Sequence, residues 1–158
     1  MRKLFFASFL TLSVLVAPAI VNAQETAFDF ISDVNLKKCL FEKYSAYSNA
    51  PETLQMLSCS GGSFTRESKK IVSIEGISKF TNLIYIDLSY NNVREIPANI
   101  GALVNLKTMD LSHNSLKTLP VEIASLVNLQ TLDLSNNKIR TFPVTTIAKL
   151  ENLRFFRV

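Results

Sequence analysis

The side chains in this sequence with the best-known catalytic chemistry are a single histidine and the serine before it. His113 is the only histidine among the 158 residues, and Ser112 precedes it directly. Neighbouring residues of a strand point to opposite faces, so this pair does not offer the hydrogen-bonded geometry that a nucleophilic serine needs. We therefore interpret His113 as a surface residue, predict no catalytic residue, and do not expect an enzyme.

Three aspartates recur at a fixed spacing and raise the question of a metal site. Asp87, Asp110 and Asp133 follow one another at intervals of 23 residues, and on neighbouring strands they would lie about 4.8 Å apart. Stacked carboxylates can bind a cation, but nearby Ser and Thr hydroxyls can also stabilise such a row. We prefer the second interpretation and predict neither a metal nor another cofactor.

The N-terminus has the pattern of a secretory signal peptide. Arg2 and Lys3 precede an uncharged apolar run at residues 4–16, and small residues at 21–23 offer a cleavage site before Gln24. The alternative is an uncleaved anchor, but the run is short for a membrane span of about 20 residues. We expect a secreted or periplasmic protein whose mature chain has no membrane span.

Charge and composition narrow the class of partner. Without residues 1–23 the chain has 15 basic and 13 acidic residues, so its formal net charge falls from +4 to +2. This excess is too small to indicate a nucleic-acid partner. The sequence also has no Asn-x-Ser/Thr glycosylation site, which favours a bacterial source.

An internal repeat is the strongest pattern in the chain. Segments that start at Leu83, Leu106 and Leu129 share the pattern LxxLxLxxN, and a fourth, partial segment starts at Leu153. A degenerate copy starts at Leu54, with extra polar residues at 63–70. One such repeat cannot bury its apolar face alone, whereas stacked repeats share a continuous core.

Each repeat has two halves with different periodicity. Apolar residues alternate in the first half, as in a strand with one buried face, and in the second half they recur every three or four residues, which suits short helical or 3-10 turns. A proline between the halves keeps the second half out of a sheet. The asparagine after each strand (Asn91, Asn114, Asn137) is expected to turn the chain and to hydrogen-bond backbone groups along the stack.

These repeats, with their LPxxIxxLxNLxxLDLSxN pattern, resemble the leucine-rich repeat family over residues 54–158. The resemblance implies an α/β solenoid with a parallel sheet on its concave face and short helical or 3-10 turns on its convex face. Residues 24–53 look like the helical N-terminal cap of internalin-like bacterial proteins. That cap leads into a phrase like IEGI at 74–77 followed by TNL at 81–83. The predicted domains are a signal peptide (1–23), a cap (24–53) and repeats (54–158).

The two cysteines are predicted to join the cap to the first repeat. Ser32 or Asp33 can N-cap a helix that continues to Tyr44 and carries Cys39, while Cys59 takes an inward position of the first strand. Two cysteines in an exported chain permit one disulfide. The alternative is a pair of small buried thiols.

The concave sheet is the predicted binding surface for a partner protein. Its aromatic and arginine side chains are residue types enriched at protein interfaces, and the resemblance implies binding to host or partner proteins. An alternative is a structural subunit of the periplasm or envelope that assembles through the solenoid end. The predicted surface consists of Tyr85, Asp87, Tyr90, Thr108, Asp110, His113, Thr131, Asp133, Asn136, Phe155 and Arg157.

The C-terminal repeat is expected to promote weak self-association. Its strand places Phe156 and Val158 in inward positions, and no capping helix follows. An uncovered solenoid end exposes apolar surface and a free strand edge. Arg154 and Arg157 are expected to limit association as charged gatekeepers.

Overall fold

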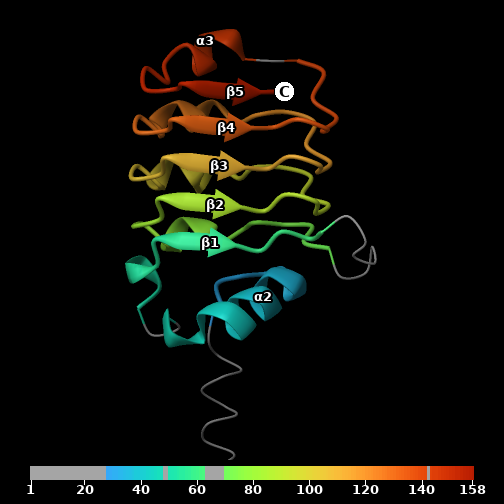
Figure 1. Cartoon of the computed structure of the whole chain (residues 1–158), viewed down its shortest axis with the longest axis vertical. Helices are drawn as coiled ribbons and strands as arrows, with labels where there is room; N and C mark the ends of the chain where they lie inside the picture. The colour runs from blue at the N-terminus through green and yellow to red at the C-terminus, as the bar shows by residue number, and fades with distance from the viewer. Residues whose placement is uncertain (1–27, 48–49, 63–69, 142) are drawn as a thin grey trace, which may run out of the picture.

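The computed structural model describes residues 28–47, 50–62, 70–141 and 143–158. The predicted signal peptide, its cleavage site and the polar stretch 63–69 lie outside these residues. Five short strands form one parallel sheet in chain order (Figure 1). They are β1 (Met56–Ser58), β2 (Tyr85–Asp87), β3 (Thr108–Asp110), β4 (Thr131–Asp133) and β5 (Phe155–Arg157). The predicted solenoid with a parallel sheet is confirmed.

The strand register follows the spacing of the repeats. Tyr85 pairs with Thr108, and Thr108 pairs with Thr131, at the 23-residue offset. Thr131 then pairs with Phe155, one residue further along. Because this register persists across the sheet, residues at equivalent positions of the repeats form straight rows.

The core lies between the strands and the convex turns. Inward side chains such as Ile86, Met109 and Leu132 are at most 1% exposed. The convex face carries the 3-10 helices η4 (Ile77–Lys79), η5 (Ala98–Ala102) and η6 (Val121–Ser125). Pro97 and Pro120 are the N-caps of η5 and η6, where their missing N–H groups remove no helical hydrogen bond. The predicted 3-10 turns are therefore confirmed.

The fourth convex turn is α-helical because its repeat is one residue longer. Helix α3 (Val144–Ile147) takes the place of a 3-10 turn. The Ile147 N–H donates to the Pro143 carbonyl at 3.1 Å, and the Ala148 N–H donates to the Val144 carbonyl at 3.0 Å. These are i to i+4 bonds, so the extra residue is taken up by widening the turn.

The asparagines after the strands form the expected ladder. Asn114 Oδ1 accepts from the Val93 N–H at 2.9 Å. Asn114 Nδ2 donates to the Leu88 carbonyl of the preceding repeat at 2.9 Å and to the Leu111 carbonyl of its own at 3.1 Å. Asn91 and Asn137 make equivalent contacts. Each amide thus satisfies buried backbone groups of two successive repeats.

The N-terminal cap is a helix fixed at its start by one carboxylate. Helix α2 (Val34–Tyr44) begins after Asp33, whose Oδ1 accepts from the Asn35 and Leu36 N–H groups at 2.9 Å each. Asp33 Oδ2 accepts from the Val72 and Ser73 N–H groups at 2.8 and 3.0 Å. Of the two N-cap candidates, Asp33 is therefore the correct one, and it also ties the cap to the first repeat.

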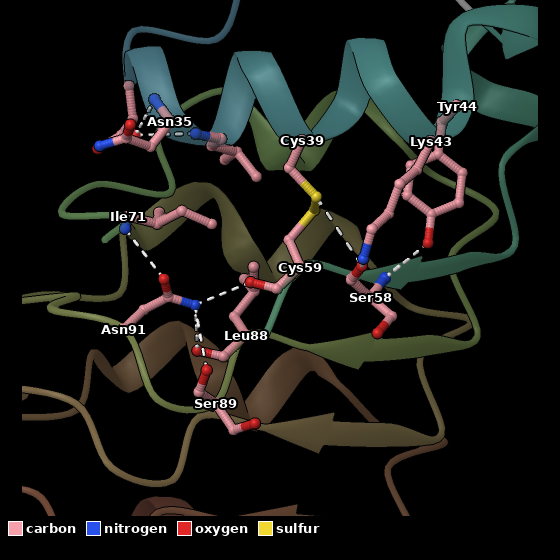
Figure 2. The surroundings of a disulfide bond; sticks show 12 residues. Asn35, Cys39, Lys43, Tyr44, Ser58, Cys59, Ile71, Leu88, Ser89 and Asn91 are labelled. Carbon is pink, nitrogen blue, oxygen red and sulfur yellow. Dashed lines mark hydrogen bonds between the residues drawn. A yellow bond between two sulfur atoms is a disulfide. The ribbon is translucent and has the colours of Figure 1, made fainter. Parts of the chain in front are cut away.

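The end of α2 covers the outer edge of β1, as Figure 2 shows. Lys43 Nζ donates to the Ser58 carbonyl at 3.0 Å, and the Ser58 N–H donates to the Tyr44 hydroxyl at 2.9 Å. A disulfide joins Cys39 of α2 to Cys59, with the two Cα atoms 6.1 Å apart. Together these contacts occupy backbone groups that an edge strand would otherwise leave unpaired.

The opposite end of the sheet is more exposed. Phe156 pairs with the fully buried Leu132 and therefore takes an inward position. It is nevertheless 39% exposed, and Val158 is 65% exposed, because β5 is the last strand of the sheet. Self-association through this end stays a prediction. Among the described residues, no helix has the length and apolar character needed to cross a membrane.

Candidate binding surface on the concave sheet

The first outward row of the sheet is apolar at both ends and polar in the middle. Strand pairing places Tyr85, Thr108, Thr131 and Phe155 side by side. Met56 of β1 extends this row next to Tyr85 and is 60% exposed. The sequence analysis missed Met56, although it holds the same position in the degenerate first repeat.

The second outward row is acidic. It runs from Ser58 through Asp87, Asp110 and Asp133 to Arg157. Oδ1 of each aspartate accepts a hydrogen bond from the backbone N–H of the serine two residues further on. The Ser89 hydroxyl also donates to Asp87 Oδ1 at 2.7 Å, and the Ser135 hydroxyl donates to Asp133 Oδ1 at 2.6 Å. Asp133 Oδ2 also lies 3.6 Å from Arg157 Nη1.

These contacts keep the carboxylates of the acidic row in a fixed arrangement. Hydrogen bonds from serine backbone and hydroxyl groups hold the carboxylates in position. Within the part of the chain that the structure describes, no group of three His, Cys, Asp or Glu side chains is arranged to hold a metal ion. The row therefore acts as a fixed line of negative charge on the concave face.

The third row lies just past the strand ends and has an unusual backbone. Tyr90, His113 and Asn136 adopt left-handed conformations, with φ of 57°, 53° and 56°. The rings of Tyr90 and His113 stack, with centroids 4.1 Å apart and planes 10° from parallel. Asn136 Nδ2 lies 3.1 Å from His113 Nε2. His113 is thus half-buried within a stack, which the interpretation as an ordinary surface residue did not include.

The aromatic side chains of the first row differ in their surroundings. Partial burial raises the pKa of the Tyr85 hydroxyl, and the nearby carboxylates of Asp87 and Asp110 raise it further. This phenol therefore stays protonated and can donate a hydrogen bond. At the other end, the Arg157 guanidinium lies 4.6 Å from the centre of the Phe155 ring, a cation–π contact.

Comparison with known protein families identifies the repeats. The family model described as "Leucine-rich repeat region" matches residues 52–158, about two thirds of the chain. The chain belongs to the leucine-rich repeat family. Members of this family commonly bind other proteins. No curated protein sequence matches this leucine-rich repeat protein.

Solved structures show the same fold in bacterial proteins. The internalin inlF of Listeria monocytogenes superposes with a TM-score of 0.65 at 22% identity, over 81% of this chain and 36% of that one. A leucine-rich repeat protein of Leptospira interrogans gives 0.56 at 24% identity, over 89% and 39%. The internalin inlC2 of Listeria monocytogenes gives 0.50 at 28% identity, over 56% and 38%. The chain spans less than two fifths of each of these proteins.

Proposed function

We propose that this leucine-rich repeat protein is an exported recognition module that binds a partner protein through its concave sheet. The observation that carries the proposal is the set of three parallel rows of outward side chains. They present aromatic groups at both ends and carboxylates between them. Aromatic and arginine anchors contribute most of the free energy in many protein interfaces.

The charge of these rows indicates the chemistry of the partner. The carboxylates of Asp87, Asp110 and Asp133 favour a basic patch on the partner, and that attraction should weaken as salt screens it. The serine contacts already hold the carboxylates in place. Because the surface is preordered, little conformational entropy is lost on binding.

The experiment that tests the proposal is affinity capture with residues 24–158 as bait, followed by mass spectrometry. Capture of one protein with a basic surface patch supports it.

A structural role in the envelope is the second candidate, and the exposed Phe155, Phe156 and Val158 at the end of the sheet favour it. If the protein has this role, the bait should capture its partner from the envelope fraction and not from the secreted fraction, and the partner should contact the solenoid end.

Replacing aromatic residues of the concave face is expected to weaken binding of the captured partner by tenfold or more. The test variants are Tyr85→Ala and Tyr90→Asn. Asparagine suits the left-handed backbone at position 90, since Asn136 adopts the same conformation in its repeat. Calorimetric titration measures the affinity, and thermal unfolding should show little change in Tm.

Tyr47→Ala is the matched control, because Tyr47 is an exposed tyrosine of the cap and belongs to none of the three rows of the sheet. Its affinity should stay within twofold of the unmodified protein. The concave-face assignment is wrong if Tyr85→Ala and Tyr90→Asn leave affinity unchanged while deletion of residues 63–70 abolishes it.

Export is part of the same proposal, and the Cys39–Cys59 disulfide supports an oxidising compartment. N-terminal sequencing of the protein recovered outside the cytoplasm should begin near Gln24. Recovery of an intact Met1 would contradict cleavage and would favour the uncleaved anchor.

A further inference from the structure

A second charged row runs along a different side of the solenoid from the concave sheet. Arg94, Lys117 and Arg140 each follow the ladder asparagine of their repeat by three residues, and all three are exposed. They belong to the segments that follow β2, β3 and β4, and the chain leaves these strands on the side toward which the arrows point in Figure 1. We call these residues, with the exposed Lys138, the basic flank.

Backbone hydrogen bonds set the spacing of the basic flank. The Ser115 N–H donates to the Val93 carbonyl at 2.9 Å, and the Lys138 N–H donates to the Leu116 carbonyl at 2.8 Å. The repeats are therefore paired here as in a parallel ladder, about 4.8 Å apart. Val93 and Leu116 are fully buried, so the basic residues that follow them point outward.

The positive charges of the flank are poorly compensated. Glu95 follows Arg94, but Thr118 and Thr141 take that position in the next two repeats. The ion pairs among the described residues involve Lys37, Lys38 and Arg157 instead of the flank. Like charges stacked on neighbouring strands repel each other, so an anion bound between them would reduce this repulsion.

The flank also forms a groove whose described lining residues are mostly polar or charged. A cavity of about 670 Å³ runs beside the last two repeats of the flank. It is lined by Lys117, Thr118, Asn137, Lys138, Ile139, Arg140 and Thr141. Ammonium and guanidinium groups recognise sulfate and carboxylate groups, and hydroxyl and amide groups match the hydrogen-bonding needs of sugar hydroxyls.

We propose that the basic flank binds a linear anionic polysaccharide that carries sulfate or carboxylate groups. Among the residues that the structure describes, no aromatic side chain on which nucleic-acid bases would stack lines the groove. The described lining of the groove also lacks an exposed apolar side chain that could insert into a membrane, since its one apolar residue, Ile139, is only partly exposed. The Asp row repels polyanions from the concave sheet, so the two surfaces are suited to different ligands and this proposal is independent of the first.

Binding of a size-defined heparin oligosaccharide to residues 24–158 tests the proposal. Titration calorimetry at low and physiological salt should show binding that weakens with salt. The test variant combines Lys117→Glu, Lys138→Glu and Arg140→Glu. The matched control combines Lys79→Glu, Lys107→Glu and Lys149→Glu, which are exposed elsewhere and change the net charge equally. The flank variant should bind at least tenfold more weakly, and the control within twofold of the unmodified protein.

Circular dichroism during thermal unfolding checks that both variants fold, which is expected because all six side chains are exposed. The proposal is overturned if heparin does not bind, or if the two variants lose affinity equally, because binding would then reflect net charge alone. It is also overturned if single-stranded DNA of matched charge, or vesicles of anionic lipid, bind the unmodified protein as tightly as heparin does.

Discussion

Replacing Asn114 by alanine is expected to lower the free energy of unfolding by about 3 kcal/mol. The side-chain amide joins the Val93 N–H to the Leu88 and Leu111 carbonyls, and Asn114 is only 7% exposed. Alanine would leave the buried Val93 N–H without an acceptor. The Leu88 and Leu111 carbonyls would lose one donor each and keep only the bonds from Asn91 and Asn137. An unsatisfied buried donor or acceptor costs about 1–3 kcal/mol, so the loss exceeds that of an ordinary hydrogen bond.

Urea unfolding followed by circular dichroism measures this loss. Asn128→Ala is the matched control, because Asn128 Nδ2 also donates to a backbone carbonyl, that of Val104 at 2.8 Å, but Asn128 is exposed. Water can replace that bond, so the control should lose less than about 0.5 kcal/mol. Equal losses in the two variants would show that the buried ladder contributes no more than a surface contact.

The same variant should affect both proposed surfaces. Asn114 lies between His113, which belongs to the concave surface, and Lys117 of the basic flank. Its amide fixes the turn that gives these two side chains their directions. A variant that remains folded but weakens both heparin and partner binding would show that the ladder sets the geometry of both.

Much of the fold could be predicted because a repeat encodes its contacts locally. The alternation around Ile86 and Leu88 predicts one buried strand face, and copies of this pattern can stack in register only one way. The asparagine after each strand has an amide with the donors and an acceptor that a tight turn requires. Both expectations hold in the structure.

Contacts between segments that are distant in the sequence were harder to predict. Local rules identify Asp33 as a helix N-cap, but nothing in them predicts that it also binds the N–H groups of Val72 and Ser73, 39 and 40 residues further on. That contact depends on how the cap docks onto the first repeat. Docking is a tertiary property for which the sequence has no repeated pattern.

The candidate binding surface could also be predicted only in part from the sequence. Alignment of the repeats predicts which side chains share a row, such as Tyr90 and His113. It does not reveal that both adopt a left-handed backbone and stack, because a left-handed tyrosine or histidine is uncommon. The basic flank is visible in the sequence as a basic residue three positions after each ladder asparagine, but the repeat pattern alone does not show that these side chains are exposed beside a groove.

Removing the disulfide is the second change expected to have a large effect. The double variant Cys39→Ser and Cys59→Ser should lose about 3 kcal/mol of unfolding free energy, because the bond closes a loop with a sequence separation of 20 residues in the unfolded chain. Most of this loss arises in the unfolded state, so the native cap should remain docked. Asp33, Lys43 and Tyr44 still hold it to the first repeat.

Urea unfolding with and without a reducing agent measures the contribution of the bond. The unmodified protein should lose stability on reduction and then match the double variant, whose stability should not respond to the reducing agent. Thiol titration of the unfolded, unreduced protein should find no free thiol. Two titratable thiols, or a stability that reduction leaves unchanged, would contradict the Cys39–Cys59 bond.

The loss of the bond has a further consequence for the sheet. Residues 56–58 of β1 are the edge strand, and α2 occupies the N–H and carbonyl groups of Ser58 on its outer side. When the cap is released during partial unfolding, that edge becomes free to pair with another chain. The double variant should therefore aggregate at lower urea concentrations than the unmodified protein, and light scattering across the same titration measures this. The reduced, unmodified protein lacks the same bond, so it should aggregate over the same range of urea concentrations as the double variant. If the reduced protein and the double variant differ, aggregation arises from the serine substitutions and not from the free edge of β1.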